Sequence, residues 1–318
     1  MRNRLRLTLP ALLLAAACGD GSRDGLRIMV PNTPGGGYDT TARVMARVMD
    51  RTGIAPDVQV FNLPGAGGTV GLRRTVNERG NGRLALQMGL GVVGASHLTR
   101  PEATVADTTP LARLIEEASA VVVPDASPYR SVGELVDAWR ADPARVTVGG
   151  GSSPGGPDHL LPMRLAKTVG IVPKRVRYVS YDGGGGELLP ALLDGTVSFG
   201  TSGFGEFLPQ IEAGQLRVLA VTGARPVEAL PGVPTLKSAG IDLEFINWRG
   251  IVAPPGISSG DRKRWVEALT ALHETPQWRA ELARRGWTDA FLTGDAFRVF
   301  LEEQDAFVAT LVTQLGLD

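Results

Sequence analysis

A stretch near the N-terminus reads LRIMVPNTPGGGYDTTARVMARVMD and spans Leu26–Asp50. Its first residues form a β-rich run, and a loop rich in proline and glycine follows over 31–37. Apolar side chains then recur at the spacing of one helical face, which predicts a helix over about Asp39–Asp50. Asp39 or Thr40 is expected to cap this helix, because such a side chain accepts a hydrogen bond from a free N–H of the first turn. The stretch therefore predicts a strand, a glycine loop and a helix in succession.

The same succession recurs three more times. Runs of β-forming residues at 58–61, 146–148 and 176–179 lead into glycine-rich loops at 64–68, 149–156 and 183–186, and each loop precedes a helical pattern. Asp158 is the expected cap of the third helix. Strands that alternate with helices at this spacing predict parallel βαβ units and an α/β fold. The C-terminal part, about Gly260–Gly316, lacks comparable runs and is predicted to be helical around a core of Trp265, Leu269, Leu282, Phe297, Phe300 and Phe307.

The amino-acid composition excludes several classes of protein function. The 318 residues include 33 Lys+Arg and 33 Asp+Glu, so the formal net charge is zero. A nucleic-acid-binding protein needs a basic surplus, which is absent here. The single cysteine excludes a disulfide framework and a cysteine-rich metal site. Glycine contributes 41 residues, about 13% against a usual value of about 7%, which indicates many tight backbone positions.

The first residues are predicted to be a secretory signal. Arg2, Arg4 and Arg6 precede a Leu- and Ala-rich run that is too short to span a bilayer. The run ends at Cys18 after three alanines, which resembles the cleavage box of bacterial lipoproteins. We expect residues 1–17 to be removed, Cys18 to carry a lipid anchor and residues 18–25 to form a flexible tether. The processed chain then has 30 basic and 33 acidic residues, a net charge of −3.

The four glycine loops are candidate anion-binding sites. A loop before a helix N-terminus gathers unpaired backbone N–H groups beside the positive end of the helix dipole, so it binds anions without a basic side chain. In a parallel sheet these loops lie at the carboxyl ends of the strands, where α/β proteins bind their ligands. The alternative is that the glycines only permit compact turns. That alternative explains one loop better than it explains four at equivalent positions.

Motifs typical of enzymes fail on chemical grounds. Residues 151–155 match the nucleophile elbow G-x-S-x-G, but Pro154 lacks the N–H that an oxyanion hole needs after the nucleophile. Residues 89–94 match the dinucleotide fingerprint G-x-G-x-x-G, yet Pro101 cuts short the helix that this loop should open. No phosphate-binding G-x-x-x-x-G-K-[ST] loop occurs in the sequence.

Metal-binding and acid–base motifs are also missing. His97, His159 and His273 show no metal-ligand spacing, and no pair of carboxylates is spaced for acid–base catalysis. We therefore expect no metal and no cofactor. His159 follows Asp158 at a predicted helix start, where it either contacts a ligand or is a structural histidine.

Six segments, in order along the chain, resemble the extracytoplasmic solute receptors of tripartite tricarboxylate transporters (the TctC or Bug family). These segments are PNTPGGGYDTTAR (Pro31–Arg43), NLPGAGG (Asn62–Gly68), GSSPGGPDH (Gly151–His159), YVSYDGGGGE (Tyr178–Glu187), PGVPTLKSAG (Pro231–Gly240) and NWRGIVAPPG (Asn247–Gly256). Each motif alone is moderately specific, and the ordered set covers nearly all of the chain from Leu26 onward.

The resemblance implies a fold as well as a function. The fold would be α/β and two-lobed, like the type II periplasmic binding proteins, with a hinge of crossing strands. The first lobe would take residues 26–125 and 248–318, and the second lobe residues 126–247. Backbone N–H groups of the first loop, together with bridging waters, would hold the carboxylates of a small ligand as the lobes close.

The ligand-binding residues implied in this way lie on both lobes. On the first lobe they are Thr33, Gly35, Gly36, Gly37, Tyr38, Asp39, Thr40, Gly65, Ala66, Gly67 and Gly68. On the second lobe they are Ser152, Ser153, Gly155, Gly156, Asp158, Ser202, Gly203 and Glu206. Asp182 and Glu187 are expected to orient loops, because like charge opposes contact with an anion unless a water or an amino group intervenes.

The function implied is that of a receptor and not of an enzyme. A monomeric lipoprotein outside the cytoplasm would capture a di- or tricarboxylate such as citrate and deliver it to the membrane subunits of the transporter. Two alternatives share these sequence features. One is a ligand-sensing receptor that feeds a signalling partner, and the other is an α/β enzyme acting on a carboxylate or phosphate substrate.

Overall fold

The structure is a computed structural model that describes residues 25–317. The predicted signal peptide, Cys18 and most of the predicted tether lie outside the described residues. Within the described part, no helix is both long enough and apolar enough to cross a membrane.

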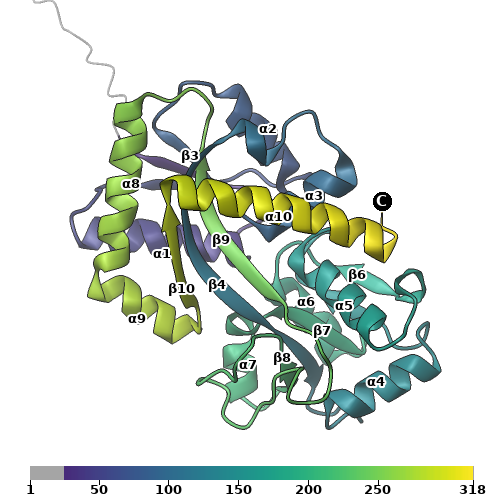
Figure 1. Ribbon diagram of the computed structural model, residues 1–318. Coiled ribbons are helices and arrows are strands. Elements are labelled where there is room, and N and C mark those ends of the chain that lie inside the picture. The colour runs from purple at the N-terminus through teal and green to yellow at the C-terminus, as the bar shows by residue number, and fades with distance from the viewer. Residues whose placement is uncertain (1–24, 318) are drawn as a thin grey trace, which may run out of the picture.

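Strands and helices alternate along most of the described chain (Figure 1). The strands are β1 (Arg27–Val30), β2 (Gln59–Asn62), β3 (Leu84–Gly89), β4 (Thr109–Pro124), β5 (Val148–Gly150), β6 (Tyr178–Ser180), β7 (Phe199–Gly203), β8 (Leu216–Val221), β9 (Ile246–Ala253) and β10 (Thr288–Thr293). The helices are α1 (Gly37–Arg51), α2 (Thr69–Asn77), α3 (Leu90–Thr99), α4 (Val132–Ala141), α5 (Pro157–Thr168), α6 (Gly185–Leu193), α7 (Leu208–Glu212), α8 (Ser259–Glu274), α9 (Pro276–Arg285) and α10 (Gly294–Leu315). Short 3-10 turns include η1 (Ala66–Gly68) and η4 (Phe204–Glu206).

The strands form one continuous mixed sheet in the order β2-β1-β3-β9-β4-β7-β5-β6. At one end β1 pairs in parallel with β2 and β3, and at the other end β5 pairs in parallel with β6 and β7. The long strands β4 and β9 pair antiparallel with each other and connect these two groups. Strands β8 and β10 each add to β4 in antiparallel fashion.

This topology gives two lobes on a shared central ribbon. We call the part with β1, β2, β3 and helices α1, α2, α3, α8 and α9 the first lobe, and the part with β5, β6, β7, β8 and helices α4 to α7 the second lobe. Strands β4 and β9 cross between them (Figure 1). The α/β, two-lobed fold with crossing strands is therefore confirmed, whereas the exact division of the sequence stays a prediction.

Helix α10 bridges the two lobes. It runs along α3 and β4, and its C-terminal end reaches α5 of the second lobe. There, Lys167 Nζ donates a hydrogen bond to the carbonyl oxygen of Gln314 at 3.1 Å. Apolar side chains of α10, among them Phe297 and Leu315, belong to a core that also contains residues of α3 and α5. The long C-terminal helix thus packs over the junction of the lobes.

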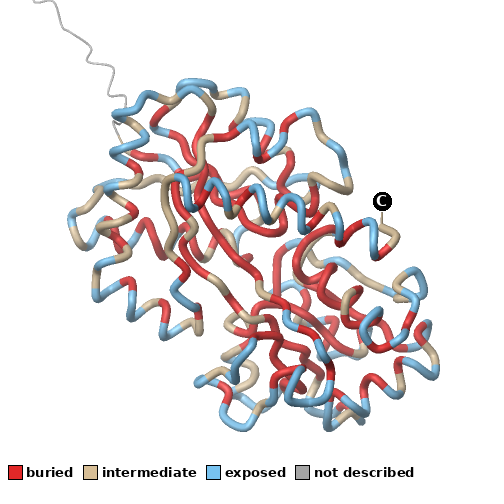
Figure 2. Tube along the Cα trace, in the orientation of Figure 1, coloured by how far each residue is buried: buried red, intermediate tan, exposed pale blue. Residues whose placement is uncertain are grey.

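The buried residues lie mainly along the sheet. Figure 2 shows buried residues along the central strands and on the sides of the helices that face them, with exposed residues on the outer sides. In α1, for example, Ala42, Met45 and Met49 lie on the buried face, as the spacing predicts. The sheet-facing position of the helices leaves the loops between strand ends and helix starts free to meet at the junction of the lobes.

Two expectations about the C-terminal part are wrong. Residues Thr288–Thr293 form β10, which pairs with β4, so this part is not purely helical. Phe307 is 42% exposed and does not belong to the core, whereas Trp265 and Phe297 are fully buried. The sequence does not reveal β10 as a strand, because only one of its residues, Ala290, is buried and no alternation of buried and exposed side chains results.

Candidate functional site

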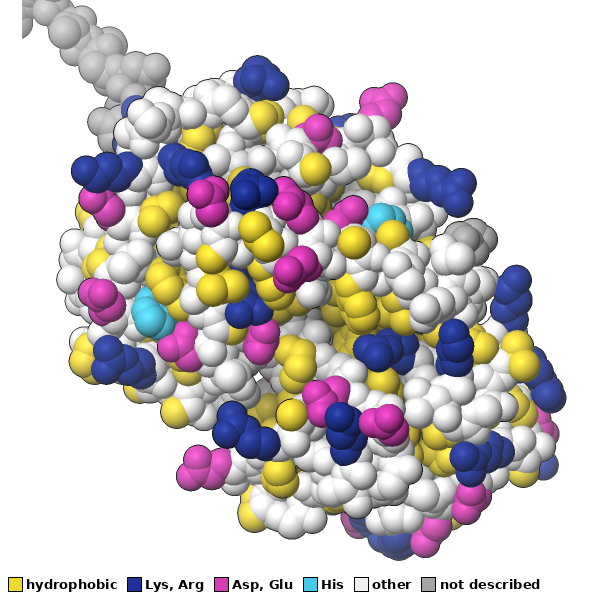
Figure 3. Space-filling view, viewed as in Figure 1, with side chains coloured by type: hydrophobic (Ala, Val, Ile, Leu, Met, Phe, Trp, Pro, Cys, Tyr) yellow, Lys and Arg dark blue, Asp and Glu magenta, His cyan; other side chains and the backbone are white. Residues whose placement is uncertain are grey.

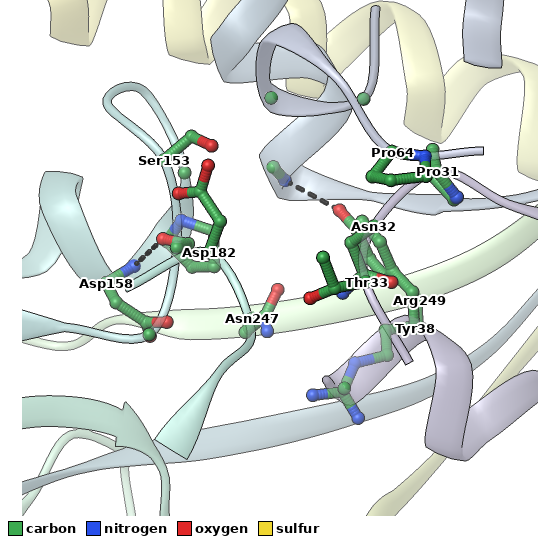
Figure 4. A pocket seen from close by; sticks show the side chains of 18 of the residues that line it. Pro31, Asn32, Thr33, Tyr38, Pro64, Ser153, Asp158, Asp182, Asn247 and Arg249 are labelled. Atoms are coloured by element: carbon green, nitrogen blue, oxygen red, sulfur yellow. Dashed lines mark hydrogen bonds between the residues drawn. The ribbon is translucent and has the colours of Figure 1, made fainter. Parts of the chain in front are cut away.

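A cavity of about 330 Å³ lies between the two lobes. Figure 4 shows first-lobe side chains such as Thr33 and Tyr38 on one side, Ser153, Asp158 and Asp182 on the other, with Asn247 between them. The complete lining is Pro31, Asn32, Thr33, Gly37, Tyr38, Pro64, Gly65, Gly67, Gly68, Gly91, Gly151, Ser152, Ser153, Gly156, Pro157, Asp158, Asp182, Glu206, Asn247 and Arg249. Three of the four glycine loops, β9 and η4 therefore meet at this cavity, and Asp182 lies directly before the fourth loop.

The first glycine loop is tied to α1 by Asp39. Gly36 in extended conformation is the N-cap of α1, so the expected cap at Asp39 or Thr40 is wrong. Asp39 lies in the first turn instead, and its Oδ2 accepts a hydrogen bond from the Gly35 N–H at 3.0 Å. Arg43 Nε and Asn62 Nδ2 also donate to this carboxylate, at 2.9 to 3.0 Å. Burial opposes ionisation of Asp39, but these hydrogen bonds outweigh it and hold its pKa below the usual range.

The start of α1 faces the cavity with unpaired backbone N–H groups. The first N–H groups of a helix have no partner within the helix, and the N-cap Gly36 supplies no side-chain acceptor. Gly37 and Tyr38, in this first turn, both line the cavity. The Tyr38 hydroxyl accepts a hydrogen bond from the Gly91 N–H at 3.0 Å, and burial raises the pKa of Tyr38 to about 12. Tyr38 is thus a neutral side chain that fixes α1 to α3.

The second loop depends on glycine for its backbone. Gly65, Gly67 and Gly68 have φ values of +145°, +64° and +97°, a region that side-chain-bearing residues rarely adopt. These three glycines line the cavity at η1, directly before α2. The loop therefore presents backbone, and not side chains, to the space between the lobes.

The third loop, on the second lobe, is held by its own side chains. His159 Nδ1 accepts a hydrogen bond from the Gly155 N–H at 3.0 Å, and burial lowers the pKa of His159 to about 4, so the ring is neutral near pH 7. Ser152 Oγ accepts from the Asp158 N–H at 3.1 Å (Figure 4). Gly156, and not Asp158, is the N-cap of α5, which corrects the predicted cap. His159 does not line the cavity and acts as a structural residue.

Arg249 on β9 is a buried cation at the base of the cavity. Its side chain is 4% exposed, and Nη2 lies 2.6 Å from Glu117 Oε2 and 3.8 Å from Glu206 Oε1. Nη1 also donates to Thr41 Oγ1 at 3.3 Å. Gly37 leaves room for the guanidinium, because a Cβ there would lie 2.3 Å from Nη2. Arg249 thus connects the helix start of the first lobe with acidic groups near the second.

Two carboxyl groups beside Arg249 have raised pKa values. Burial is the largest cause for Asp158, and the charges of Glu206 and Glu117 add to it, which raises the pKa well above the usual range. Burial and the charge of Glu117 likewise raise the pKa of Glu206 to about 7. Ser202 Oγ donates to Asp158 at 3.4 Å, and the Gly185 N–H donates to Glu206 at 2.6 Å. The cavity therefore holds more acidic groups than its single arginine compensates.

Several buried polar atoms at the cavity have no hydrogen-bond partner. Among the described residues these atoms include Asn32 Oδ1, Thr33 Oγ1, Asn247 Oδ1 and Arg249 Nε. Each of the four residues lines the cavity. Buried polar atoms of folded proteins are normally satisfied, so their accumulation at one place indicates a site that is completed by a bound molecule or by water.

The predicted ligand-binding residues divide into two groups. Those that line the cavity are Thr33, Gly37, Tyr38, Gly65, Gly67, Gly68, Ser152, Ser153, Gly156, Asp158 and Glu206. Those outside the lining are Gly35, Gly36, Asp39, Thr40, Ala66, Gly155, Ser202 and Gly203. Ser202 donates a hydrogen bond to Asp158, which lines the cavity, whereas Asp39 binds Gly35, which does not. A Cβ at Gly203 would lie 2.5 Å from the Glu117 carboxyl group. Contact with a ligand stays a prediction for all of them.

Sequence reasoning missed part of the lining. The missed residues are Pro31, Asn32, Pro64, Gly91, Gly151, Pro157, Asn247 and Arg249. Asp182, expected only to orient a loop, lines the cavity and accepts a hydrogen bond from Ser180 Oγ at 2.7 Å, whereas Glu187 accepts one from the Gly183 N–H at 2.9 Å. A detectable signal for Arg249 was a charged residue within an apolar strand, because arginine is rarely buried without a purpose.

His159 is not arranged as a catalytic base at this cavity. The nitrogen His159 Nδ1 is occupied by the Gly155 N–H and is not paired with a serine. Within residues 25–317 no group of three or more His, Cys, Asp or Glu side chains is placed to hold a metal ion.

Comparisons with known proteins agree with this geometry. The family described as the tripartite tricarboxylate transporter family receptor (TctC) matches residues 41–317. A UPF0065 protein from the gbd 5′ region of Cupriavidus necator is 27% identical over 295 residues, which cover 92% of this chain and 88% of that protein. MatC from Rhodopseudomonas palustris with bound malate is similar with a TM-score of 0.80 at 21% identity, over 91% of this chain and 98% of that chain. An R. palustris protein with adipate has a TM-score of 0.83 at 22% identity, over 93% and 99%.

The family match extends over most of the sequence, and the similar structures share the two-lobed fold over nearly their whole length. The members of this family are extracytoplasmic solute-binding proteins, so the alternative of an α/β enzyme is not supported. The chain belongs to the receptor family of the tripartite tricarboxylate transporters.

Proposed function

We propose that this receptor captures a small di- or tricarboxylate in the cavity between its lobes and delivers it to the membrane subunits of a tripartite tricarboxylate transporter. The observation that carries the ligand class is the start of α1, where Gly37 and Tyr38 line the cavity in a helical turn without a side-chain cap. Unpaired N–H groups at the positive end of a helix dipole favour a carboxylate.

The distribution of charge supports capture by local groups. On the face shown in Figure 3, basic and acidic side chains are interspersed and no large basic patch is visible. With the predicted signal removed the chain has a net charge of −3. A general positive field is therefore not available to attract an anion, and the N–H groups of the glycine loops take that role. The malate and adipate held by two proteins of the same fold are both dicarboxylates, which supports this ligand class.

The cellular setting belongs to the same proposal. A receptor for a membrane transporter has to stay near the membrane, and a lipid on Cys18 followed by a short tether would keep it there while its lobes open and close. Mass spectrometry of the N-terminal peptide would reveal an acylated Cys18. A Cys18→Ala chain found in the same membrane fraction as the wild type would contradict the anchor.

A thermal-shift screen of the purified chain against a carboxylate panel tests the ligand class. A ligand that binds only the folded state at 100 times its Kd stabilises it by about 2.7 kcal/mol, so Tm rises by several degrees. Thr33→Val should weaken that response, because it removes the buried Oγ1 atom that has no partner within the described residues. Thr196→Val, at an exposed position outside the cavity, is the matched control. If no carboxylate raises Tm, the proposal is wrong.

A further inference from the structure

The second-lobe side of the cavity is acidic. Asp158, Asp182 and Glu206 line it, and Glu117 lies behind Glu206 and Arg249. A pocket built only for a di- or tricarboxylate would place ligand anions against this wall. Asp182 is exposed, whereas Asp158 is buried, and once the buried acidic groups are ionised their charge opposes a second carboxylate at this wall.

The single arginine does not neutralise the wall. Arg249 is closest to Glu117, at 2.6 Å, and its distance to Glu206 is 3.8 Å. Neither Asp158 nor Asp182 forms an ion pair within residues 25–317, and the hydrogen bond from Ser202 Oγ to Asp158 is long, at 3.4 Å. Asp158 is nevertheless only 5% exposed. A buried carboxylate without a cation is costly and is neutralised by a proton instead, so a cationic group of a ligand would take the place of that proton here.

An independent observation comes from Asn247 on β9. The residue is 7% exposed, and its Oδ1 atom has no hydrogen-bond partner within the described residues. Figure 4 shows Asn247 between Asp158 and Asp182 on one side and Thr33 on the other, pointing into the cavity. An amide oxygen is an acceptor only, so a donor from a bound molecule or a water completes it. The same wall thus offers carboxylate oxygens and an unused amide oxygen.

We propose that the ligand is an amino-bearing carboxylate, with its carboxylate on the N–H groups of the first-lobe loops and its ammonium on the wall formed by Asp158, Glu206 and Asn247. This inference rests on the proposed carboxylate-binding function and narrows its ligand class. An ammonium donates three hydrogen bonds and carries the charge that the wall lacks. Burial and neighbouring acidic charges raise the pKa values of Asp158 and Glu206, and a bound ammonium would favour the ionised form of both groups.

The test compares matched pairs that differ by one amino group. Isothermal titration calorimetry of the purified chain compares succinate with aspartate, glutarate with glutamate, and adipate with 2-aminoadipate. The three pairs differ in length, so that one of them fits the cavity. We expect the amino-bearing member of the best pair to bind at least tenfold more tightly. If the plain dicarboxylate binds as tightly or more tightly in every pair, this inference is overturned while the proposed function stands. If no compound of either kind binds, both are overturned.

A substitution assigns the preference to the wall. Asp158→Asn keeps the shape and removes the charge, so the amino-bearing ligand should lose at least tenfold in affinity while the plain dicarboxylate gains. Glu228→Gln, at an exposed position outside the cavity, changes the net charge equally and should leave both affinities unaltered. A preference that persists in Asp158→Asn overturns the inference. Circular dichroism checks that the variant is folded, and if it is not, the wild-type ratio decides alone.

Discussion

Replacing Gly94 by alanine should weaken ligand binding without touching the ligand site. Gly94 lies in α3 of the first lobe, and its backbone meets the Gly155 loop of the second lobe. A Cβ on Gly94 would lie 1.9 Å from the carbonyl oxygen of Gly155, far below ordinary contact. The lobes would have to separate by about 1 Å or more to relieve this overlap. Ligands that need the lobes together would then bind less well.

The size of the effect follows from two opposing terms. Overpacking of this kind costs about 1–3 kcal/mol, which corresponds to a roughly 5- to 140-fold weaker affinity at about 1.4 kcal/mol per tenfold. If the lobes separate in the ligand-free protein, as the proposed capture of a ligand requires, the overlap is absent there, and alanine is a better helix former than glycine by about 1 kcal/mol. The Tm of the ligand-free protein should therefore stay level or rise while the affinity falls.

Calorimetry and thermal unfolding measure both quantities on the same sample. Gly133→Ala is the matched control, because Gly133 also lies in a helix, α4, and within residues 25–317 its added Cβ would meet only Ser131 Oγ, at 3.7 Å. The control should raise Tm and leave the affinity unchanged. An unchanged affinity in Gly94→Ala would refute the idea that close contact of the two loops is part of the binding-competent state.

Three further predictions concern the charged groups. Arg249→Met should lower the free energy of unfolding by about 3–5 kcal/mol in urea titrations, because the Glu117 carboxylate is left buried without a counter-charge. Adding Glu117→Gln should restore most of this loss, and losses that simply add in the double variant would contradict the prediction. Glu206 has a pKa of about 7 in the folded protein against an ordinary 4.5, so the folded protein binds this proton more tightly than the unfolded chain. The protonated group therefore stabilises the fold fully below pH 4.5, and about 3 kcal/mol of that stabilisation is lost as the pH rises through 7. Urea titrations across that range should show a flatter pH dependence in Glu206→Gln, and an identical slope would count against the assigned burial. Asp39→Ala should cost about 1.5–3 kcal/mol in the same assay, since the Gly35 N–H and the Arg43 and Asn62 side chains lose a charged acceptor. No loss of stability would contradict the role of Asp39 in holding the first loop.

The repeated strand, loop and helix units were predictable because their signals are local. Alternation of β-rich runs, glycines and helical spacing extends over about 25 residues and predicts the α/β fold. It also predicts a helix directly after the loop at 64–68, where the structure has α2 (Thr69–Asn77). Helix starts were less predictable. Asp39 and Asp158 are typical caps, but Gly36 and Gly156 adopt the extended conformation first, so both helices begin earlier. Instead of capping a helix, Asp39 accepts a hydrogen bond from the first loop and Asp158 lines the cavity.

The charged base of the cavity could not be assigned from local patterns. Arg249 and Asn247 lie on β9, about 200 residues beyond the first loop, and they reach it only because β9 pairs with β3 and β4. The segment that contains them was noticed as a motif, yet nothing in the sequence states which strands pair. The same limit explains β10, whose partner β4 precedes it by more than 160 residues.

The central claim is that the cavity between the lobes binds a carboxylate and releases it unchanged. Equilibrium dialysis of the purified chain with an isotopically labelled form of the best ligand from the thermal-shift panel tests this most directly. The account predicts one molecule bound per chain, saturable and recovered chemically intact after denaturation, with weaker retention by Thr33→Val. No saturable binding, or recovery of the label in a different compound, would contradict it.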